Sequence, residues 1–248
     1  MDSLPQEIID EIINYLPLRS NLRSSSLVAK SWRKTSQQRL LRVIRFLNET
    51  KVNDWYTYTR DEPDGIASYV QVTKFRHITK WKDPTLFIRV LKSLTSLTKL
   101  LMLDTEIPDE ILELFSHGEL GRRITVLHLR APLCSISTVI SMSLSLPNLQ
   151  KLCVDDCMIT SRKTPSTHAV LPRREPLNSL FLSGHVDEVV EALTNSQFTS
   201  RRLLFDFRIP NIQRLLISSS TIIRELMLVG MHSVVDCRSG DYNPIVYR

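Results

Sequence analysis

The sequence predicts an α/β chain in which a small all-helical module precedes an irregular, right-handed solenoid of short strands and helices. Three observations carry this prediction: an amphipathic pattern at the N-terminus, a change of texture past Gly65, and an apolar pattern that then recurs every 23 to 28 residues. The length of 248 residues is ample for a buried core, and a hydrophobic content of 42% is too high for a disordered chain.

Several broad classes are excluded by composition. No stretch approaches the ~20 uninterrupted apolar residues of a membrane span, and the acidic start lacks the basic region of a signal peptide. Four cysteines are too few for a disulfide scaffold of this size, so we expect reduced structural thiols in a cytoplasmic or nuclear protein. They are Cys134, Cys153, Cys157 and Cys237.

The first 47 residues read as a bundle of short helices. Leu4, Ile8, Ile12 and Leu16 recur every four residues, which predicts an amphipathic helix that Ser3 can cap and Pro17 stops. Leu22 and Leu27 suit a second helix capped by Ser20, and Val28 and Trp32 suit a third. A core of this size is marginal alone, so the module needs a partner or the rest of the chain.

Positive charge is concentrated in the same region. Between Ile12 and Asn48 there is no acid, and eight cations give a local charge of +8 against +6 for the whole chain. Arg39, Arg42 and Arg45 recur every third residue, which predicts an amphipathic helix over residues 37–48 with one basic face. An acidic partner, nucleic acid and a merely solvated face all fit this pattern.

The N-terminal apolar pattern resembles the F-box motif. The matching elements are Leu4-Pro5, Glu7-Ile8, Ile12, Leu16-Pro17, Leu22, Ser26-Leu27-Val28, Lys30 and Trp32. The resemblance implies docking to the Skp adaptor of a cullin–RING ubiquitin ligase, with Trp32 packed in the module's own core. It implies adaptor contacts at Leu4, Pro5, Ile8, Leu16, Leu22 and Val28. A plain helical cap whose leucines form core is the alternative.

The later part of the chain repeats the pattern apolar-x-x-apolar-x-apolar. Its units start at Leu97, Ile124, Leu149, Leu177, Ser200 and Ile223, and a weaker unit has Val70 and Val72. We expect a strand in each unit and helices between them, over residues 84–96, 108–117, 136–146, 186–195 and 211–218. Asp83 and Ser135 are the expected caps of two of these helices.

These units resemble leucine-rich repeats, and F-box modules joined to such repeats recur in fungi, plants and animals. The chain as a whole resembles the fungal-type F-box/leucine-rich-repeat family. The repeats are irregular, because only Cys157 conforms at the position that the family fills with Asn or Cys. The expected organisation is an F-box module with its basic helix at 1–47, a linker at 48–66, the solenoid at 67–231 and a non-repeat tail at 232–248.

One residue of each strand is expected on the concave face of the solenoid. The candidate substrate-binding row is Leu101, His128, Cys153, Phe181, Leu204 and Met227. It is apolar where a solvated face should be polar, which is typical of an interaction surface. Its charged flanks are Lys99, Lys151 and Arg202 on one side and Arg130, Asp155 and Asp206 on the other. A register slip of one residue would bury the row instead.

No motif for catalysis, metal binding or a cofactor is present. The six histidines lack zinc-protease spacing, and no phosphate loop or nucleophile elbow occurs. We therefore expect a non-catalytic substrate receptor without cofactor, whose partners are the Skp adaptor and an unidentified protein substrate, and neither membrane nor nucleic acid. A repeat scaffold without ligase recruitment and, after it, a basic nucleic-acid-binding protein are the alternatives.

Overall fold

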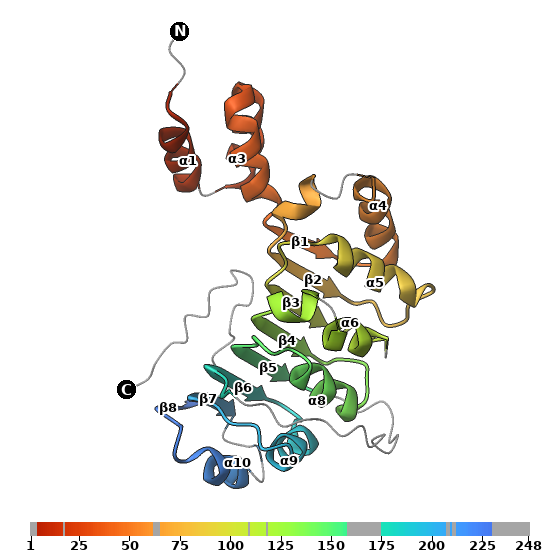
Figure 1. Ribbon diagram of the computed structural model, residues 1–248, viewed down its shortest axis with the longest axis vertical. Helices are drawn as coiled ribbons and strands as arrows, with labels where there is room; N and C mark the ends of the chain where they lie inside the picture. The colour runs from red at the N-terminus through yellow and green to blue at the C-terminus, as the bar shows by residue number, and fades with distance from the viewer. Residues whose placement is uncertain are drawn as a thin grey trace.

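The computed structural model describes residues 4–16, 18–61, 65–108, 110–117, 119–157, 175–206, 209 and 212–229. Three helices form the N-terminal module: α1 (Gln6–Tyr15), α2 (Arg19–Val28) and α3 (Lys30–Leu41). They lie at one end of an eight-stranded parallel sheet whose strands follow one another in chain order (Figure 1). The expected α/β class is confirmed at this level.

The sheet runs from the N-terminal module to the far end of the molecule. Its strands are β1 (Val43–Phe46), β2 (Val72–Arg76), β3 (Lys99–Leu103), β4 (Val126–Arg130), β5 (Lys151–Asp155), β6 (Ser179–Ser183), β7 (Arg202–Asp206) and β8 (Glu225–Val229). All neighbouring pairs are parallel, which requires a crossover between each strand and the next.

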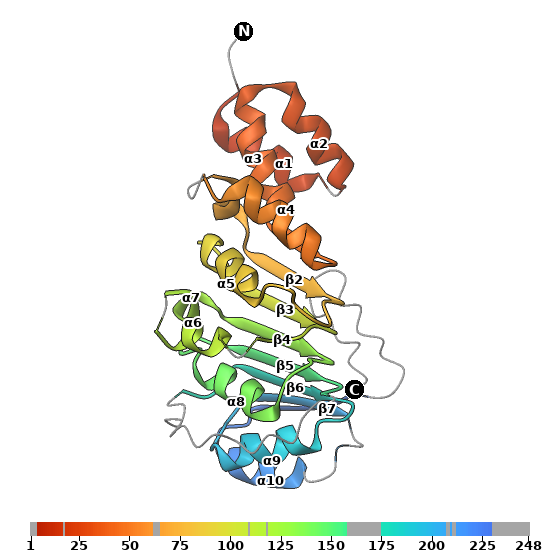
Figure 2. The same cartoon turned by 90° about the vertical axis from the view of Figure 1, so that its right-hand side faces the viewer.

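Within the described residues, helices form the crossover of every neighbouring pair except β5 and β6, and they cover one face of the sheet. Residues 158–174, between β5 and β6, lie outside the described part of the chain. The helices are α4 (Glu49–Thr59), the 3₁₀ helix η1 (Ile66–Tyr69), α5 (Pro84–Ser93), α6 (Ile111–His117), α7 (Glu119–Arg123), α8 (Ile136–Leu144), α9 (Asp187–Asn195) and α10 (Ile212–Ser219). Figure 1 shows α4, α5, α6 and α8 on the same side of the strands, and Figure 2 shows the helices in succession along the sheet. Two expected caps are confirmed: Asp83 accepts a hydrogen bond from the Thr85 amide, and Ser135 accepts one from the Thr138 amide.

Two expectations for residues 37–66 are wrong. The expected basic helix over 37–48 ends with α3 at Leu41, and Val43–Phe46 forms β1. Ile44 and Phe46 are buried while Arg45 is exposed, so the alternation of a strand takes precedence over the three-residue arginine spacing. The expected linker at 48–66 contains α4, which Asn48 caps by accepting a hydrogen bond from the Lys51 amide. The sheet therefore begins at Val43, not at residue 67. The expected tail at 232–248 lies outside the described residues.

The core lies between the sheet and its helices. It is built from two inward positions on each of strands β1 to β7, and the strand register places the equivalent residues side by side. At the first position stand Ile44, Thr73, Leu100, Leu127, Leu152, Leu180 and Leu203, all buried. At the first inward position of β8, Leu226 is exposed. From the sequence, the weak first unit has Val70 and Val72. The inward residues of its strand, β2, are instead Thr73 and Phe75.

Aromatic rings close the core next to the N-terminal module. Phe75 of β2 lies 5.2 Å from Phe46 of β1 and 4.8 Å from Phe87 of α5, measured between ring centroids. Trp81 packs on both Phe75 and Phe87, and Trp55 of α4 meets Phe46 edge-on at 6.3 Å. Such pairs add to the stabilisation that burial of their large apolar surface provides. The first strand is therefore anchored to the second by stacked rings.

The same turn follows five of the strands. His77, Asp104, Ala131, Asp156 and Gly184, each directly after a strand, have a positive φ. The amides of the first four donate to the last carbonyl of the next strand, as from Asp104 to Arg130 at 2.8 Å. Gly184 is required at its position, because a Cβ there would lie 1.9 Å from the Asp156 Oδ1.

The chain passes from α3 into β1 through Arg42 alone. The Arg42 carbonyl accepts hydrogen bonds from the amides of Gln71 and Val72, both at 3.0 Å, and its Nε donates to the Gln71 Oε1 at 2.8 Å. Three hydrogen bonds thus hold the junction against the entry of β2, and no flexible connection separates the module from the sheet.

Thr73 occupies a core position that is aliphatic in its neighbours. Its side chain is fully buried, and within the described part of the chain its hydroxyl has no hydrogen-bond partner. We expect Thr73→Val to raise the free energy of unfolding by about 1 kcal/mol, because a buried unpaired hydroxyl is replaced by a methyl group of similar size. Denaturant unfolding of the purified chain measures the change.

Thr138→Val is the matched control for this substitution. Thr138 is also buried, but its hydroxyl lies 2.8 Å from the Ser135 hydroxyl, so the same change should lower the free energy of unfolding. If both variants shift in the same direction, the hydroxyl of Thr73 is not the source of the effect.

Candidate functional site

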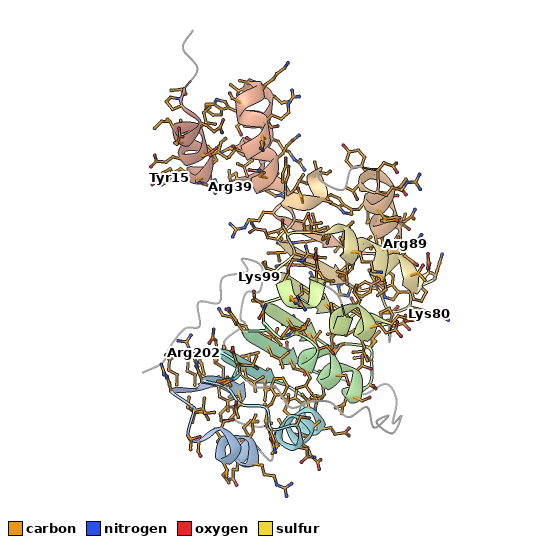
Figure 3. The ribbon with its side chains drawn as sticks, in the orientation of Figure 1. Tyr15, Arg39, Lys80, Arg89, Lys99 and Arg202 are labelled. Atoms are coloured by element: carbon orange, nitrogen blue, oxygen red, sulfur yellow. The ribbon has the colours of Figure 1, made fainter. Side chains whose placement is uncertain are left out.

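An apolar stripe runs along the outer side of the N-terminal module. Leu4 precedes α1, and Ile8, Ile12 and Tyr15 follow on one face of the helix. All four are exposed, Tyr15 by 78%, whereas Ile9 and Ile13 of the same helix are buried. Figure 3 labels Tyr15 on α1. Exposed apolar surface of this kind marks an interaction site in a soluble protein. We call these four residues the α1 stripe.

The interior of the module is small, and two of the expected adaptor contacts lie in it or against it. Ile9, Ile13 and Leu22 form its buried cluster, against which Leu16, Trp32 and Leu40 pack in part. Leu22 is only 5% exposed, because its side of α2 faces the other two helices, so the structure places it in the core and not on a docking surface. Leu16 is half-buried on the same cluster. Trp32 packs there, as its expected role requires.

Hydrogen bonds fix α1 to α3 on the side away from the stripe. Asp10 accepts bonds of 2.7 Å from the hydroxyl of Thr35 and from the Gln6 amide, and the Gln6 amide also donates to Thr35 at 3.1 Å. The bonds from Thr35 and then Gln6 hold the pKa of Asp10 below its usual value, so the carboxylate stays charged. Gln6 and Asp10 of α1 are therefore hydrogen-bonded within the module, on the side of the helix opposite the exposed α1 stripe.

Further exposed apolar residues lie at the ends of α2. Val28, an expected contact, is exposed, as is Pro5 before α1. Leu18 and Leu27 are exposed as well, and neither was expected at the site. Ile12 and Tyr15 were also missed, although their spacing from Ile8 on the helix is a signal that could have found them.

The basic stretch does not form one face. Arg19 donates to the Leu40 carbonyl at 3.0 Å within the module, and Arg42 donates to Gln71 at 2.8 Å across the junction with the sheet, so both have structural roles. Arg39 is half-buried on α3, while Arg45 lies on β1. The remaining cations are spread over α2 and α3: Arg23, Lys30, Arg33 and Lys34. A continuous track for nucleic acid is thus absent from this described region.

The candidate row on the sheet is assembled in the expected register. Leu101, His128, Cys153, Phe181, Leu204 and Met227 are direct neighbours on successive strands. Cys153, Phe181 and Leu204 form a hydrophobic cluster with Met227, separate from the main core, which places the row on the face opposite the helices. The row nevertheless is buried, His128 to 3% exposure, and only Met227 is partly exposed. The one-residue register slip considered from the sequence does not occur. The side chains of the row are buried because they pack against one another.

The flanks of the row carry most of the charge. Arg130 and Asp155 form an ion pair of 3.4 Å on one side, where burial and the neighbouring Asp156 raise the pKa of Asp155. Lys99 and Arg202 lie on the other side and point away from the helix layer, opposite Arg89 in Figure 3. The side chain of Asp206, a further expected flank, lies outside the described residues.

The described residues contain no metal-ion site and only thiols of low reactivity. Its His, Cys, Asp and Glu side chains include no group of three or more that could hold a metal ion. Cys134, Cys153 and Cys157 are buried and form no disulfide, and burial, then Glu188, raises the pKa of Cys157 to about 11. A thiol of that pKa is unreactive at neutral pH. Among the same residues no helix is long and apolar enough to span a bilayer.

Comparison with known proteins identifies one part of the chain. The family model of the F-box domain matches residues 1–43, which are α1 to α3 and the first residue of β1. No curated protein matches the chain.

His128 makes the stability of the sheet depend on pH. Burial, with Lys74 and Arg130, lowers its pKa to about 4, below the ~6.5 of an unfolded chain. The folded state therefore excludes a proton that the unfolded state binds, and its stability should fall as pH drops from about 6.5 towards 4. We expect the wild type to lose about 2 kcal/mol more than His128→Leu between pH 7 and pH 5.

Denaturant unfolding of both proteins at the two pH values measures this difference. Equal losses would contradict a neutral, buried His128, since other titrating groups are common to both chains.

Proposed function

The chain carries an F-box domain at residues 1–43, and we propose that it is a substrate-recognition subunit of an SCF-type cullin–RING E3 ubiquitin ligase. F-box domains bind Skp adaptors in these ligases. The observation that carries the proposal is the α1 stripe, whose large apolar side chains are exposed while Ile9 and Ile13 of the same helix are buried. Burying this stripe against the adaptor offers the stabilisation that the small module lacks alone.

The adaptor contacts that the structure supports are Leu4, Pro5, Ile8 and Val28, with Ile12, Tyr15, Leu18 and Leu27 added from their exposure. Leu22 and Leu16 act indirectly in this proposal, by shaping the module that presents the stripe. The family's adaptor is acidic, and the cations of α2 and α3 complement it.

The parallel sheet is proposed to be an irregular leucine-rich-repeat-like solenoid that binds the target protein. The regular order of strands, the inward aliphatic column and the repeated positive-φ turn after each of five strands support this assignment. The proposed role is non-catalytic and belongs to the cytoplasm or nucleus: it holds a substrate at high effective concentration beside the transfer enzyme.

Ile8→Asp tests the docking role of the α1 stripe. A carboxylate at this exposed position leaves the buried cluster intact but would have to be desolvated in an apolar interface. We expect at least a tenfold loss of affinity for the Skp adaptor, measured by surface plasmon resonance with the full chain.

Asn14→Asp provides the control, because it adds the same charge to an exposed position of α1 about a third of a turn or more from the stripe. Its affinity should stay within about twofold of the wild type. A wild-type chain that does not bind the adaptor contradicts the proposal, and leaves a repeat scaffold as the simpler reading. An equal loss of adaptor affinity in both variants would show that the α1 stripe is not part of the interface.

A further inference from the structure

A basic hollow lies at the edge of the sheet where strands β5 to β8 begin. It encloses about 250 Å³ and is lined by Lys151, Asn178, Ser179, Arg201, Arg202, Arg224 and Glu225. Four cations thus face one carboxylate within a space large enough for a single anionic group and its neighbours. The parallel register brings them together, since Lys151 and Ser179 are paired and Arg202 is paired with Glu225. We call these seven residues the basic hollow.

The single acid of the basic hollow is already neutralised. Arg202 and Glu225 form a two-pronged ion pair, with Nε–Oε2 at 2.7 Å and Nη2–Oε1 at 2.9 Å. These bonds from Arg202 hold the pKa of Glu225 below its usual value, so it remains ionised. The pair fixes the guanidinium plane of Arg202 across the two strands.

The other three cations have no such partner. Within the described residues, Lys151, Arg201 and Arg224 form no ion pair, and all three are exposed. An anion in the hollow would supply these cations with the opposite charge that no ion pair of the described chain gives them. The hollow therefore carries about three positive charges that the described chain does not balance.

Side chains, not the backbone, are the available donors here. The amide of Arg201 donates to the Leu177 carbonyl at 2.8 Å, and that of Arg224 to the Arg201 carbonyl at 2.7 Å. Guanidinium groups offer paired N–H donors that match a carboxylate or phosphate in both spacing and plane. The free groups thus suit an oxyanion that carries several acceptor atoms.

Apolar surface continues from the hollow along the same face. Phe181, Leu204 and Met227 each stand two residues beyond a lining residue on its own strand, and side chains two apart share a face. Met227 is partly exposed at the end of this row. A ligand seated in the hollow can therefore place an anionic group on the arginines and an adjacent apolar side chain on Met227.

We infer that the basic hollow binds a carboxylate or phosphate group on an acidic peptide segment of the target protein, with a neighbouring apolar residue on Met227. The inference rests on the proposed substrate-receptor function and names the chemistry of the substrate. A peptide fits better than a nucleic acid, because the cations converge on one hollow and Val126 interrupts the flanking column between Lys99 and Lys151. A nucleic-acid strand needs cations spaced along its phosphates.

Fluorescence anisotropy with dye-labelled probes tests the inference on the full chain bound to its adaptor. The probes are a short peptide with a run of glutamates followed by leucine, its glutamine counterpart, a counterpart with phosphoserines, and a single-stranded RNA of equal length. Wild type should bind the glutamate or phosphoserine peptide at least about tenfold tighter than the glutamine peptide, and less tightly as salt is raised. The comparison of the two anionic peptides decides which oxyanion the hollow takes.

The variant Arg201→Glu/Arg224→Glu should lose at least about tenfold in this affinity. Arg122→Glu/Arg214→Glu makes the same charge change at exposed positions on α7 and α10 and should bind within about twofold of wild type. The inference is overturned by equal binding of all three peptides, by equal losses in both variants, by no peptide binding up to about 1 mM, or by tighter binding of RNA. Adaptor affinity of the same variants should equal that of wild type, so a failure of adaptor docking is distinguished from a failure of the hollow.

Discussion

The passage of the chain from α3 into β1 is the constraint on which the rest of the structure depends. A single residue, Arg42, separates the last helix of the F-box domain from the first strand of the sheet, and its carbonyl is held by two amides at the entry of β2. The F-box domain has a thin interior of its own, with Ile9, Ile13 and Leu22 as its buried cluster. The aromatic cluster around Phe75 anchors β1, so the sheet supplies a rigid base for helices that would be marginal alone.

This rigid joint gives the two surfaces of the molecule a fixed relation. The α1 stripe lies at one end, and the basic hollow lies on β5 to β8 towards the other (Figures 1 and 2). A receptor that holds its ligase and its target in fixed positions raises the effective concentration of target lysines at the transfer site more than one with a flexible joint. The sequence suggested a linker at 48–66; had the connection between the module and the sheet been flexible, that advantage would have been lost.

The parts of the fold that follow from local pattern could be predicted. The apolar spacing located β3 to β8 and their shared register, and Asp83 and Ser135 located two helix starts. The strand β1 could not be predicted, because its four residues are too short a run and the arginine spacing also fits a helix. The basic hollow could not be predicted either. Arg201 and Arg224 precede their strands, and only the parallel register brings them beside Lys151. Burial of Leu22 depends on how three helices pack, which a one-dimensional pattern does not contain.

Whether the F-box domain and the sheet unfold cooperatively is the most direct test of a rigid joint between α3 and β1. Trp32 reports on the F-box core, so a Trp55→Phe/Trp81→Phe chain carries its tryptophan fluorescence in that domain alone. Far-UV circular dichroism of the same chain reports mainly on the sheet and its helices. With a rigid joint, both signals should share one denaturant midpoint. A fluorescence transition that is complete before the circular dichroism changes would show that the F-box domain unfolds independently, and would contradict the rigid joint.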